Sequence, residues 1–304
     1  RRNYNFNTQY AINYNLTKAL SLNFTAANTN IVRNYFVDDV LNGRQNPNLD
    51  VWDGFFDLGD PNIQNQQLQV NYEIPLYKIP TLSFMRATYS YTGDFQWQKG
   101  SDLYGQVDGF NQEEINTVQN SNTHNLNTSL DMGRLYRYIG LVKKPTRTVR
   151  TRTRTAGPPG GGAQKVEKPK SGNKKGTKLL NAGIDILTSI KRVQINYSEN
   201  NGTFLPGYNR TPGFVGTLKP TLGFTFGSQS DVRQEAARRG WLTGFQEFNQ
   251  QFTQTHSEQL DISASLEPVR DLKIDITGNK TYFENYAENY RVRDFLDANG
   301  NFVP

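Results

Sequence analysis

Few side chains in this sequence are of the types that carry out chemistry. The chain has 304 residues, no Cys and only two His, His124 and His256, which are far apart in polar surroundings. Without thiols there are no disulfides, zinc–cysteine sites or thiol nucleophiles, and two isolated His leave little for metal or acid–base chemistry. We therefore predict a protein that is not an enzyme and that binds no cofactor.

One loop brings carboxylates close together in the sequence. Asp50, Asp53, Asp57 and Asp60 are interspersed with aromatic residues, and carboxylates are the ligands that calcium prefers. Their spacing does not follow the D-x-[DN]-x-[DN]-G loop, however. We interpret them as turn residues and predict no metal site.

The composition favours β-strands over both disorder and transmembrane helices. Hydrophobic residues make up 35% of the chain and the mean hydropathy is -0.71, yet 12% of the residues are aromatic. Disordered chains are poor in aromatic residues, and no apolar run approaches the roughly 18 residues of a membrane helix. A polar chain with many aromatic residues must gather them on a narrow surface, and alternating strands do this.

The N-terminal region shows this alternation most clearly. Even positions from Tyr4 to Leu16 are mainly aromatic or aliphatic, whereas odd positions are almost all amides, and the alternation resumes after a turn at 17–19. The first strand has about 13 residues, against about 9–11 for a membrane-spanning strand. We predict a transmembrane hairpin, while alternation alone also permits a half-exposed soluble sheet. The residues expected to face lipid are Tyr4, Phe6, Tyr10, Ile12, Tyr14, Leu20, Leu22 and Phe24, and those expected to face the lumen are Asn5, Asn7, Asn13 and Asn23.

The same pattern recurs along the chain. Further strands are predicted near 68–74, 82–91, 126–132 and 193–197, and a second clear hairpin is predicted at 260–276. In the segment that contains Phe84 the apolar residues change from even to odd positions, which predicts a β-bulge there.

The connections between these strands alternate in length. Short turns lie near 17–19, 75–81 and 267–271, and long loops lie near 28–66, 93–121 and 199–250. Outer-membrane barrels have short periplasmic turns and long extracellular loops. We therefore expect an all-β protein, a segment of a very large antiparallel transmembrane β-barrel with long extracellular loops and one helix-containing periplasmic insertion. Barrel strands are assigned to 1–132 and 192–304, and the insertion to 133–191.

The insertion holds most of the positive charge. Residues 143–178 contain twelve Lys and Arg and one acid, Glu167, so the segment carries +11 and the rest of the chain carries −5 of the net +6. Its Gly and Pro run cannot build a core, and a short helix is predicted at 179–191. The segment is either a docking site for an acidic partner or for lipid phosphates, or a solvated linker. The basic residues assigned to the periplasm include Lys143, Lys144, Arg147, Arg150, Arg152, Arg154, Lys174 and Lys175.

The loop at 199–250 is predicted to be folded. It combines aromatic residues with a helix from Asp231 to Arg239, which Asp231 begins as a capping box with Gln234 and Gly240 ends. A loop with its own helix and apolar anchors should be ordered. We expect it to pack over or into the pore mouth and to contact cargo or an accessory protein, or else only to protect the barrel rim.

Four stretches resemble the SprA/Sov family, the giant outer-membrane translocons of the type IX secretion system in Bacteroidota. They are Pro80–Trp97, Asn122–Tyr138, Asn196–Tyr208, and Leu266–Pro268 with Asp271–Ile274. The resemblance covers nearly the whole chain and an internal part of a much longer family protein. It implies a protein-conducting pore that exports folded cargo to the cell surface and is linked to gliding motility. It also implies partners, namely secreted cargo proteins, a small outer-membrane barrel that receives cargo, a plug protein and periplasmic accessory proteins. Outer-membrane lipid is a further expected partner of the strands, and nucleic acid is not expected, because the positive charge belongs to one segment and not to a folded face.

Two other functions fit the residues alone. The chain could be a barrel segment of another outer-membrane transporter, such as a nutrient receptor, for which an upstream plug sequence would be diagnostic. It could also be a soluble carbohydrate-binding β-protein, which would purify without detergent.

Overall fold

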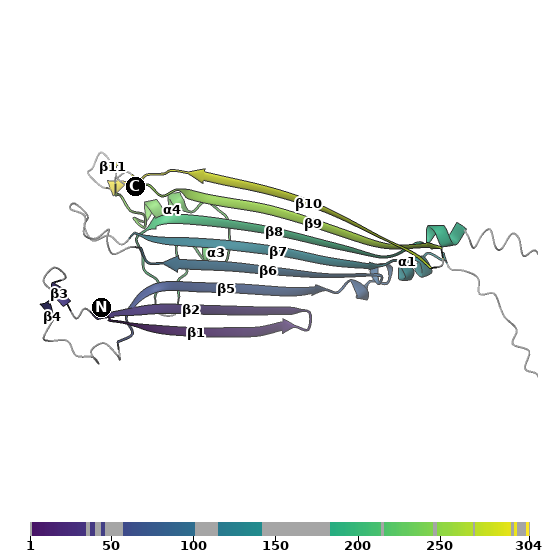
Figure 1. Cartoon of the computed structure of the whole chain (residues 1–304), viewed down its shortest axis with the longest axis horizontal. Helices are drawn as coiled ribbons and strands as arrows, with labels where there is room; N and C mark the ends of the chain where they lie inside the picture. The colour runs from purple at the N-terminus through teal and green to yellow at the C-terminus, as the bar shows by residue number, and fades with distance from the viewer. Residues whose placement is uncertain are drawn as a thin grey trace, which may run out of the picture.

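The protein is mostly antiparallel β-sheet. A computed structural model describes residues 2–34, 37–39, 44–45, 57–100, 115–141, 183–213, 216–245, 248–269, 271–292, 295–296 and 302–303. Eight long strands form one open sheet in the order β1-β2-β5-β6-β7-β8-β9-β10, so each pairs with its neighbour along the chain (Figure 1). In the described residues, β1 and β10 form the two edges of this sheet.

The long strands contain 14 to 19 residues, far more than the about 5–6 that are usual. Their bounds are β1 (Arg2–Thr17), β2 (Leu20–Asn34), β5 (Asp60–Ile74), β6 (Met85–Gln98), β7 (Asn116–Asp131), β8 (Ile190–Tyr208), β9 (Phe252–Val269) and β10 (Leu272–Glu288). Two small pairs stand apart from the sheet, β3 (Val37–Asp39) with β4 (Arg44–Gln45) and β11 (Phe295–Leu296) with β12 (Phe302–Val303).

The helices are short and lie in the connections. They are η1 (Leu76–Lys78), η2 (Pro80–Leu82), α1 (Met132–Tyr138), α3 (Leu222–Thr225), α4 (Arg233–Arg238) and a helical turn at 183–187. None of the helices in these parts of the chain is long and apolar enough to cross a membrane.

The connections are sorted between the two ends of the strands (Figure 1). One end, called here the turn end, holds the β1–β2 turn, η1 and η2, α1, the helix at 183–187 and the β9–β10 turn. The other end, called here the loop end, holds the connections 35–59, 99–115 and 209–251. The predicted alternation of short and long connections is therefore confirmed with one exception, the long connection from β7 to β8 at the turn end, which is the predicted insertion.

The strands run further into the predicted loops than the alternation indicates. β2 continues to Asn34 and β5 starts at Asp60, so the loop predicted at 28–66 is shorter, and β6, β7 and β8 shorten the loops predicted at 93–121 and 199–250 in the same way. The reason is that the residues near the loop end, such as Gln64 to Gln66, are polar on both faces. A strand with two polar faces gives no alternation to detect.

Two local predictions are wrong. The bulge predicted near Phe84 does not occur, because β6 starts at Met85 after η2 and pairs with β5 and β7 without a register shift. The capping box predicted at Asp231 and Gln234 does not form either. Helix α4 has Val232 at its N-cap without a side-chain cap, and Asp231 accepts instead from the backbone N–H of Arg233 at 2.9 Å.

Other local predictions hold. Gly240 ends α4 with a positive φ of 64°, as a C-terminal glycine should. The helix predicted at 179–191 is confirmed at 183–187, but it is shorter because β8 already starts at Ile190. The basic residues predicted between 143 and 178, and Asp50 and Asp53, lie outside the described residues.

Candidate functional site

Each face of the sheet has its own chemistry. Direct cross-strand partners point to the same face, so Ile12, Phe24, Leu68 and Gly93 share one face along their pairs. We call this face the band face. The opposite face, which carries Asn13 and its cross-strand partner Asn23, is called the amide face. The residues of the first hairpin that were expected to face lipid all lie on the band face, and those expected to face the lumen all lie on the amide face.

An apolar band crosses the band face on all eight strands. Exposed side chains of this band include Ile12 at 59% and Ile276 at 54%. Soluble monomers rarely leave so wide an apolar surface uncovered. The main residues of the band are Tyr10, Ile12, Tyr14, Leu22, Phe24, Leu68, Val70, Tyr72, Tyr89, Tyr91, Leu126, Leu130, Val193, Ile195, Tyr197, Leu260, Ile262, Leu266, Ile274 and Ile276.

The band is slanted relative to the cross-strand pairs. The loop-end border of the band in β1 is Tyr10, because the next residue on this face is the polar Thr8. In β9 the border is Leu260, because the next residue on this face is the charged Glu258. The row of direct partners that starts at Tyr10 reaches β9 at Gln254, six residues nearer the loop end than Leu260. That row is Tyr10, Ala26, Gln66, Phe95, Asn120, Thr203 and Gln254.

The slant has a simple geometric meaning. The shift of six residues accumulates over six strand-to-strand steps, so the band moves one residue per strand. With a rise of about 3.3 Å per residue and a strand spacing of about 4.8 Å, a level band would require strands tilted by about 35°. Tyr4 and Phe6 lie on the band face but beyond the band, toward the loop end.

Ionisable side chains gather at the loop-end border of the band. Glu199 in β8 lies opposite His124 in β7 and Glu258 in β9. The Nε2 atom of His256 is 3.3 Å from the Glu258 carboxylate, and its Nδ1 atom is 4.0 Å from that of Glu199. Both His side chains of the protein therefore lie near Glu199 at the loop-end border of the band. Local sequence does not reveal this cluster, because the cluster depends on the register between strands that are joined by long connections.

The amide face is covered by polar side chains that bond to one another. Cross-strand hydrogen bonds join Gln67 to Asp94 at 2.7 Å and Thr123 to Asn200 at 2.9 Å. A hollow of about 610 Å³ crosses this face near the loop end. Uncharged residues that line it include Gln9, Thr25, Asn65, Gln96, Gln119 and Thr255.

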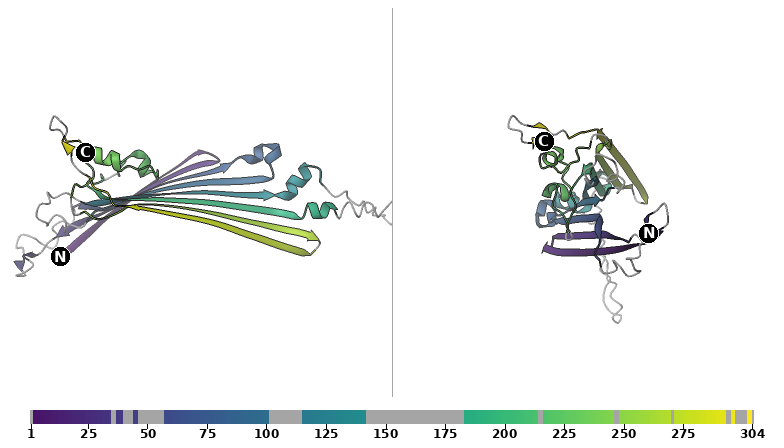
Figure 2. Two further views of the ribbon diagram at one scale, coloured as in Figure 1. Left: turned by 90° about the horizontal axis from the view of Figure 1, so that it is seen from above. Right: turned by 90° about the vertical axis from the view of Figure 1, so that its left-hand side faces the viewer.

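The folded loop, which we call the cap (residues 209–251), packs against the band face beside the loop end (Figure 2). Phe226 meets Phe24 edge to face at 6.1 Å, and Phe224 meets Phe95 at 6.2 Å. Because the amide face is on the other side of the sheet, the cap does not lie over the surface predicted to line a pore. The prediction of an ordered loop is confirmed, and its place at a pore mouth stays a prediction.

The cap is held by a core and by side chains that bond to its backbone. Asn120 Nδ2 donates to the carbonyls of Phe224 and Ser228 at 2.9 and 2.8 Å, and Gln66 Nε2 donates to that of Thr217 at 3.0 Å. These amides interrupt the apolar alternation of the strands at the loop end, which explains why the alternation fades there. The buried core beneath the cap consists of Phe95, Trp97, Val118, Leu205, Tyr208, Phe224, Val232, Ala236, Trp241, Leu242 and Phe252.

Gly93 provides space for the cap. A Cβ atom at this position would overlap the backbone carbonyl of Phe226. We expect Gly93→Ala to loosen the cap by about 1–3 kcal/mol, as overpacking does, and to speed proteolysis within 216–229. Gly278→Ala is the matched control, because Gly278 lies on the same face with open space around it. Equal protection of the cap in both variants would contradict this view of the contact.

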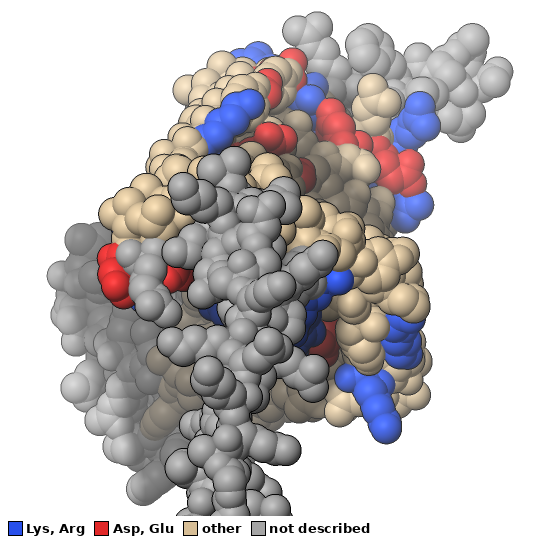
Figure 3. All heavy atoms as spheres, turned by 90° about the vertical axis from the view of Figure 1, so that its right-hand side faces the viewer, with Lys and Arg blue, Asp and Glu red and all other residues tan. Residues whose placement is uncertain are grey.

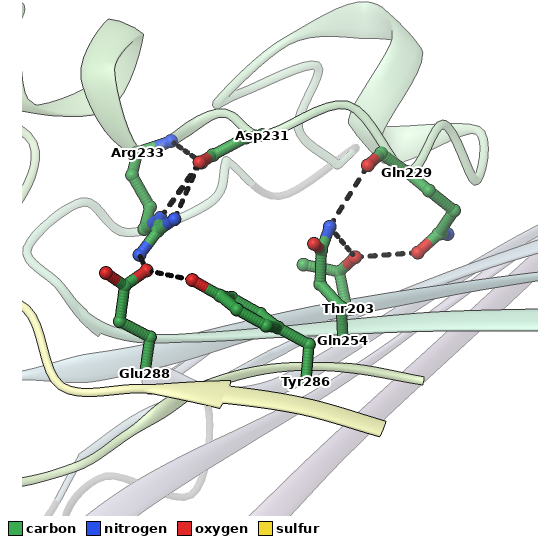
Figure 4. A network of polar contacts seen from close by, with 7 residues as sticks. All are labelled: Thr203, Gln229, Asp231, Arg233, Gln254, Tyr286 and Glu288. Carbon is green, nitrogen blue, oxygen red and sulfur yellow. Dashed lines mark hydrogen bonds and ion pairs between the residues drawn. The ribbon is translucent and has the colours of Figure 1, made fainter. Parts of the chain in front are cut away.

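An ion-pair network fastens the cap to the edge of the sheet (Figure 4). The Arg233 guanidinium contacts the carboxylates of Asp231 at 2.8 Å and Glu288 at 2.6 Å, and it lies 4.1 Å from the centre of the Phe252 ring. Tyr286 donates to the same Glu288 carboxylate at 2.6 Å. Helix α4 is thereby tied to both β9 and β10.

This network makes the cap sensitive to acid. Hydrogen bonds from Arg233 lower the pKa of Asp231 below its usual 3.8. A lowered pKa means that the stabilisation is complete above pH 3.8 and is lost as the pH falls through the lowered value. We expect the urea midpoint of the cap, followed by near-UV circular dichroism, to fall in that range. Asp231→Asn should remove this part of the pH dependence, and an unchanged pH profile in that variant would contradict the assignment.

A scan against protein-family models gives no match, and no curated protein matches the sequence. The parts of the chain that the structure describes hold no group of three or more His, Asp or Glu side chains placed to bind a metal ion. The surfaces that distinguish this chain are therefore the band, the amide face and the cap.

Proposed function

We propose that this chain is a segment of a very large transmembrane β-barrel in the bacterial outer membrane. The observation that carries the proposal is the slanted apolar band. A flat membrane crosses tilted strands at a constant height, so its contact surface must shift steadily from strand to strand. The tilt of about 35° that the shift requires falls within the range of outer-membrane barrels, about 35–45°. The border of the band, with Tyr91, Tyr197 and Tyr282, corresponds to the aromatic girdle of such barrels.

In this arrangement the amide face lines the lumen and the edges β1 and β10 pair with further strands. A long unpaired edge strand is a liability that proteins avoid, and closure into a barrel removes it. The turn end lies in the periplasm and the loop end outside the cell, because short periplasmic turns and long outer loops are the rule. The basic segment at 143–178 then belongs to the periplasmic side.

We propose further that the pore conducts proteins, as the resemblance to the SprA/Sov family implies. Most side chains of the amide face are uncharged, with Asp94 and Asp261 among the exceptions, and some of them bond to one another. Such a lining offers passing polypeptides few strong partners, whereas ion-selective pores use rings of charge. The partners would be secreted cargo, a small outer-membrane barrel, a plug protein and periplasmic accessory proteins.

The test is a photo-crosslinking experiment in cells that secrete. A photoreactive amino acid at Gln119 or Ser263, both on the amide face, should crosslink to cargo in transit. The same amino acid at Ile262, the neighbour of Ser263 on the band face, should give no cargo crosslink. Cargo crosslinks at Ile262 alone, or at none of the three positions during active secretion, would contradict the proposal.

A further inference from the structure

Three connections at the turn end expose pairs of large apolar side chains. We call these six residues the turn-end patch. They do not belong to strands, so the alternation of the two faces does not account for them. Tyr77 also lines a hollow on the amide face at this end, next to Glu73 and Arg86. The patch consists of Tyr77 and Ile79 on η1 and its C-cap, Tyr138 and Ile139 at the end of α1, and Ile186 and Leu187 in the helix at 183–187, with exposures of 47% to 65%.

Two of the pairs have a basic residue directly beside them, since Lys78 lies between Tyr77 and Ile79 and Arg137 precedes Tyr138. The third pair follows Asp185 directly, and the next basic residue after it is Lys191, the second residue of β8. In the described residues, none of these three cations has a carboxylate within ion-pair distance. Arg137 and Lys191 bond only to backbone carbonyls of their own connections, at 3.3 Å each. Arg134 on α1 is different, since it pairs with Asp131 at 3.2 Å.

The turn-end patch lies at the ends of strands that carry the apolar band. The short helices η1 and η2 lie between the end of β5 at Ile74 and the start of β6 at Met85. Helix α1 begins after Asp131, the last residue of β7, and the helix at 183–187 leads into β8. Figure 3, which views the turn end, shows several basic side chains on this end, with acidic side chains also present. Exposed apolar pairs on three separate connections fit contact with an extended surface better than contact with a single small ligand.

We propose that the turn-end patch lies in the interface of the adjoining membrane leaflet and binds anionic lipid headgroups. The apolar side chains enter the acyl boundary, as in amphipathic interfacial helices. The cations extend along them to the lipid phosphates. The segment 143–178 is poor in apolar residues, so it is unsuited to cover this patch. This inference rests on the proposed function, because it takes the band to be in lipid.

The first test uses the absence of Cys from the chain. Single Cys residues replace Ile12 in the band, Ile79 and Leu187 in the patch, and Glu235 in the cap, and each carries a fluorescent label in the reconstituted protein. Lipids with brominated acyl chains should quench the labels at 12, 79 and 187 and spare the label at 235. Quenching at 12 together with free access of a water-soluble quencher to 79 and 187 would overturn this inference and leave the proposed function standing. No quenching at any position would overturn both.

A protein partner is a third outcome of the same experiment. Labels at 79 and 187 that neither brominated lipid nor the water-soluble quencher reaches would show that protein covers the patch, and the lipid assignment would be wrong. The second test measures the motionally restricted fraction of spin-labelled phosphatidylglycerol relative to phosphatidylcholine. Lys78→Gln with Arg137→Gln should reduce the preference for phosphatidylglycerol, whereas Arg210→Gln with Arg238→Gln, the same charge change at the loop end, should not. An equal loss in both double variants would contradict a specific site.

Discussion

Replacing Phe224 with Ala is expected to detach the cap while leaving the sheet intact. Phe224 is completely buried, its ring meets that of Phe95, and its carbonyl accepts from Asn120. Truncating a buried Phe costs about 3–5 kcal/mol, which is a large share of what one loop can gain from docking. Limited proteolysis should therefore cut within 216–245 much faster in this variant, with unchanged far-UV circular dichroism from the strands.

Leu222 provides the matched control for this prediction. It lies on the same short helix, α3, two residues before Phe224, but it is 60% exposed. Leu222→Ala should change cap stability by no more than about 0.5 kcal/mol, as is usual for exposed positions. Similar proteolysis of the two variants would mean that the cap is not held by its core.

Placing a charge in the band is expected to disturb membrane insertion severely. Ile12 lies within the band on β1 and is 59% exposed, so Ile12→Arg should cost about 2–4 kcal/mol if that surface meets the middle of a bilayer. The cost is measured from guanidinium-dependent folding into lipid vesicles. The physical cause is the transfer of a guanidinium from water into hydrocarbon.

The neighbouring residue tests the two faces against each other. Asn13 lies on the amide face, and Asn13→Arg should have little effect if this face meets water. Equal costs at the two positions would rule out a lipid-facing band and would favour a sheet that is covered or wetted alike on both sides.

The alternation of side chains predicts the strands well where one face is apolar. In the first hairpin it correctly assigns Ile12 and Asn13 to opposite faces, and the register of β1 with β2 agrees. The second hairpin at 260–276 is also found, because Leu260 and Ile262 alternate with polar residues. The prediction fails where both faces are polar, as at Gln64 in β5, since periodicity then disappears although the backbone pairing continues.

The surface on which the cap docks could not be predicted from local sequence. The contact between Gln66 and Thr217 joins residues separated by 151 positions, and only the folded register brings them together. The cluster of His124, Glu199 and His256 depends on the same registers. The local sign of this docking is an amide side chain on the band face, such as Asn120, which bonds to the backbone of the cap.

The order of the strands in the sheet governs how the protein can assemble. Because each strand pairs with its neighbour along the chain, the sheet can grow strand by strand. The contacts are short in sequence within the hairpins β1–β2 and β9–β10 and span longer connections elsewhere. The cap cannot form so early, since its backbone must meet β5 and its helix α4 must meet β10. We therefore expect the cap to close last, after the strands from β5 to β10 have paired in register. Pulse proteolysis during folding should show the hairpins becoming protected before the cap, and the reverse order would contradict this sequence of events.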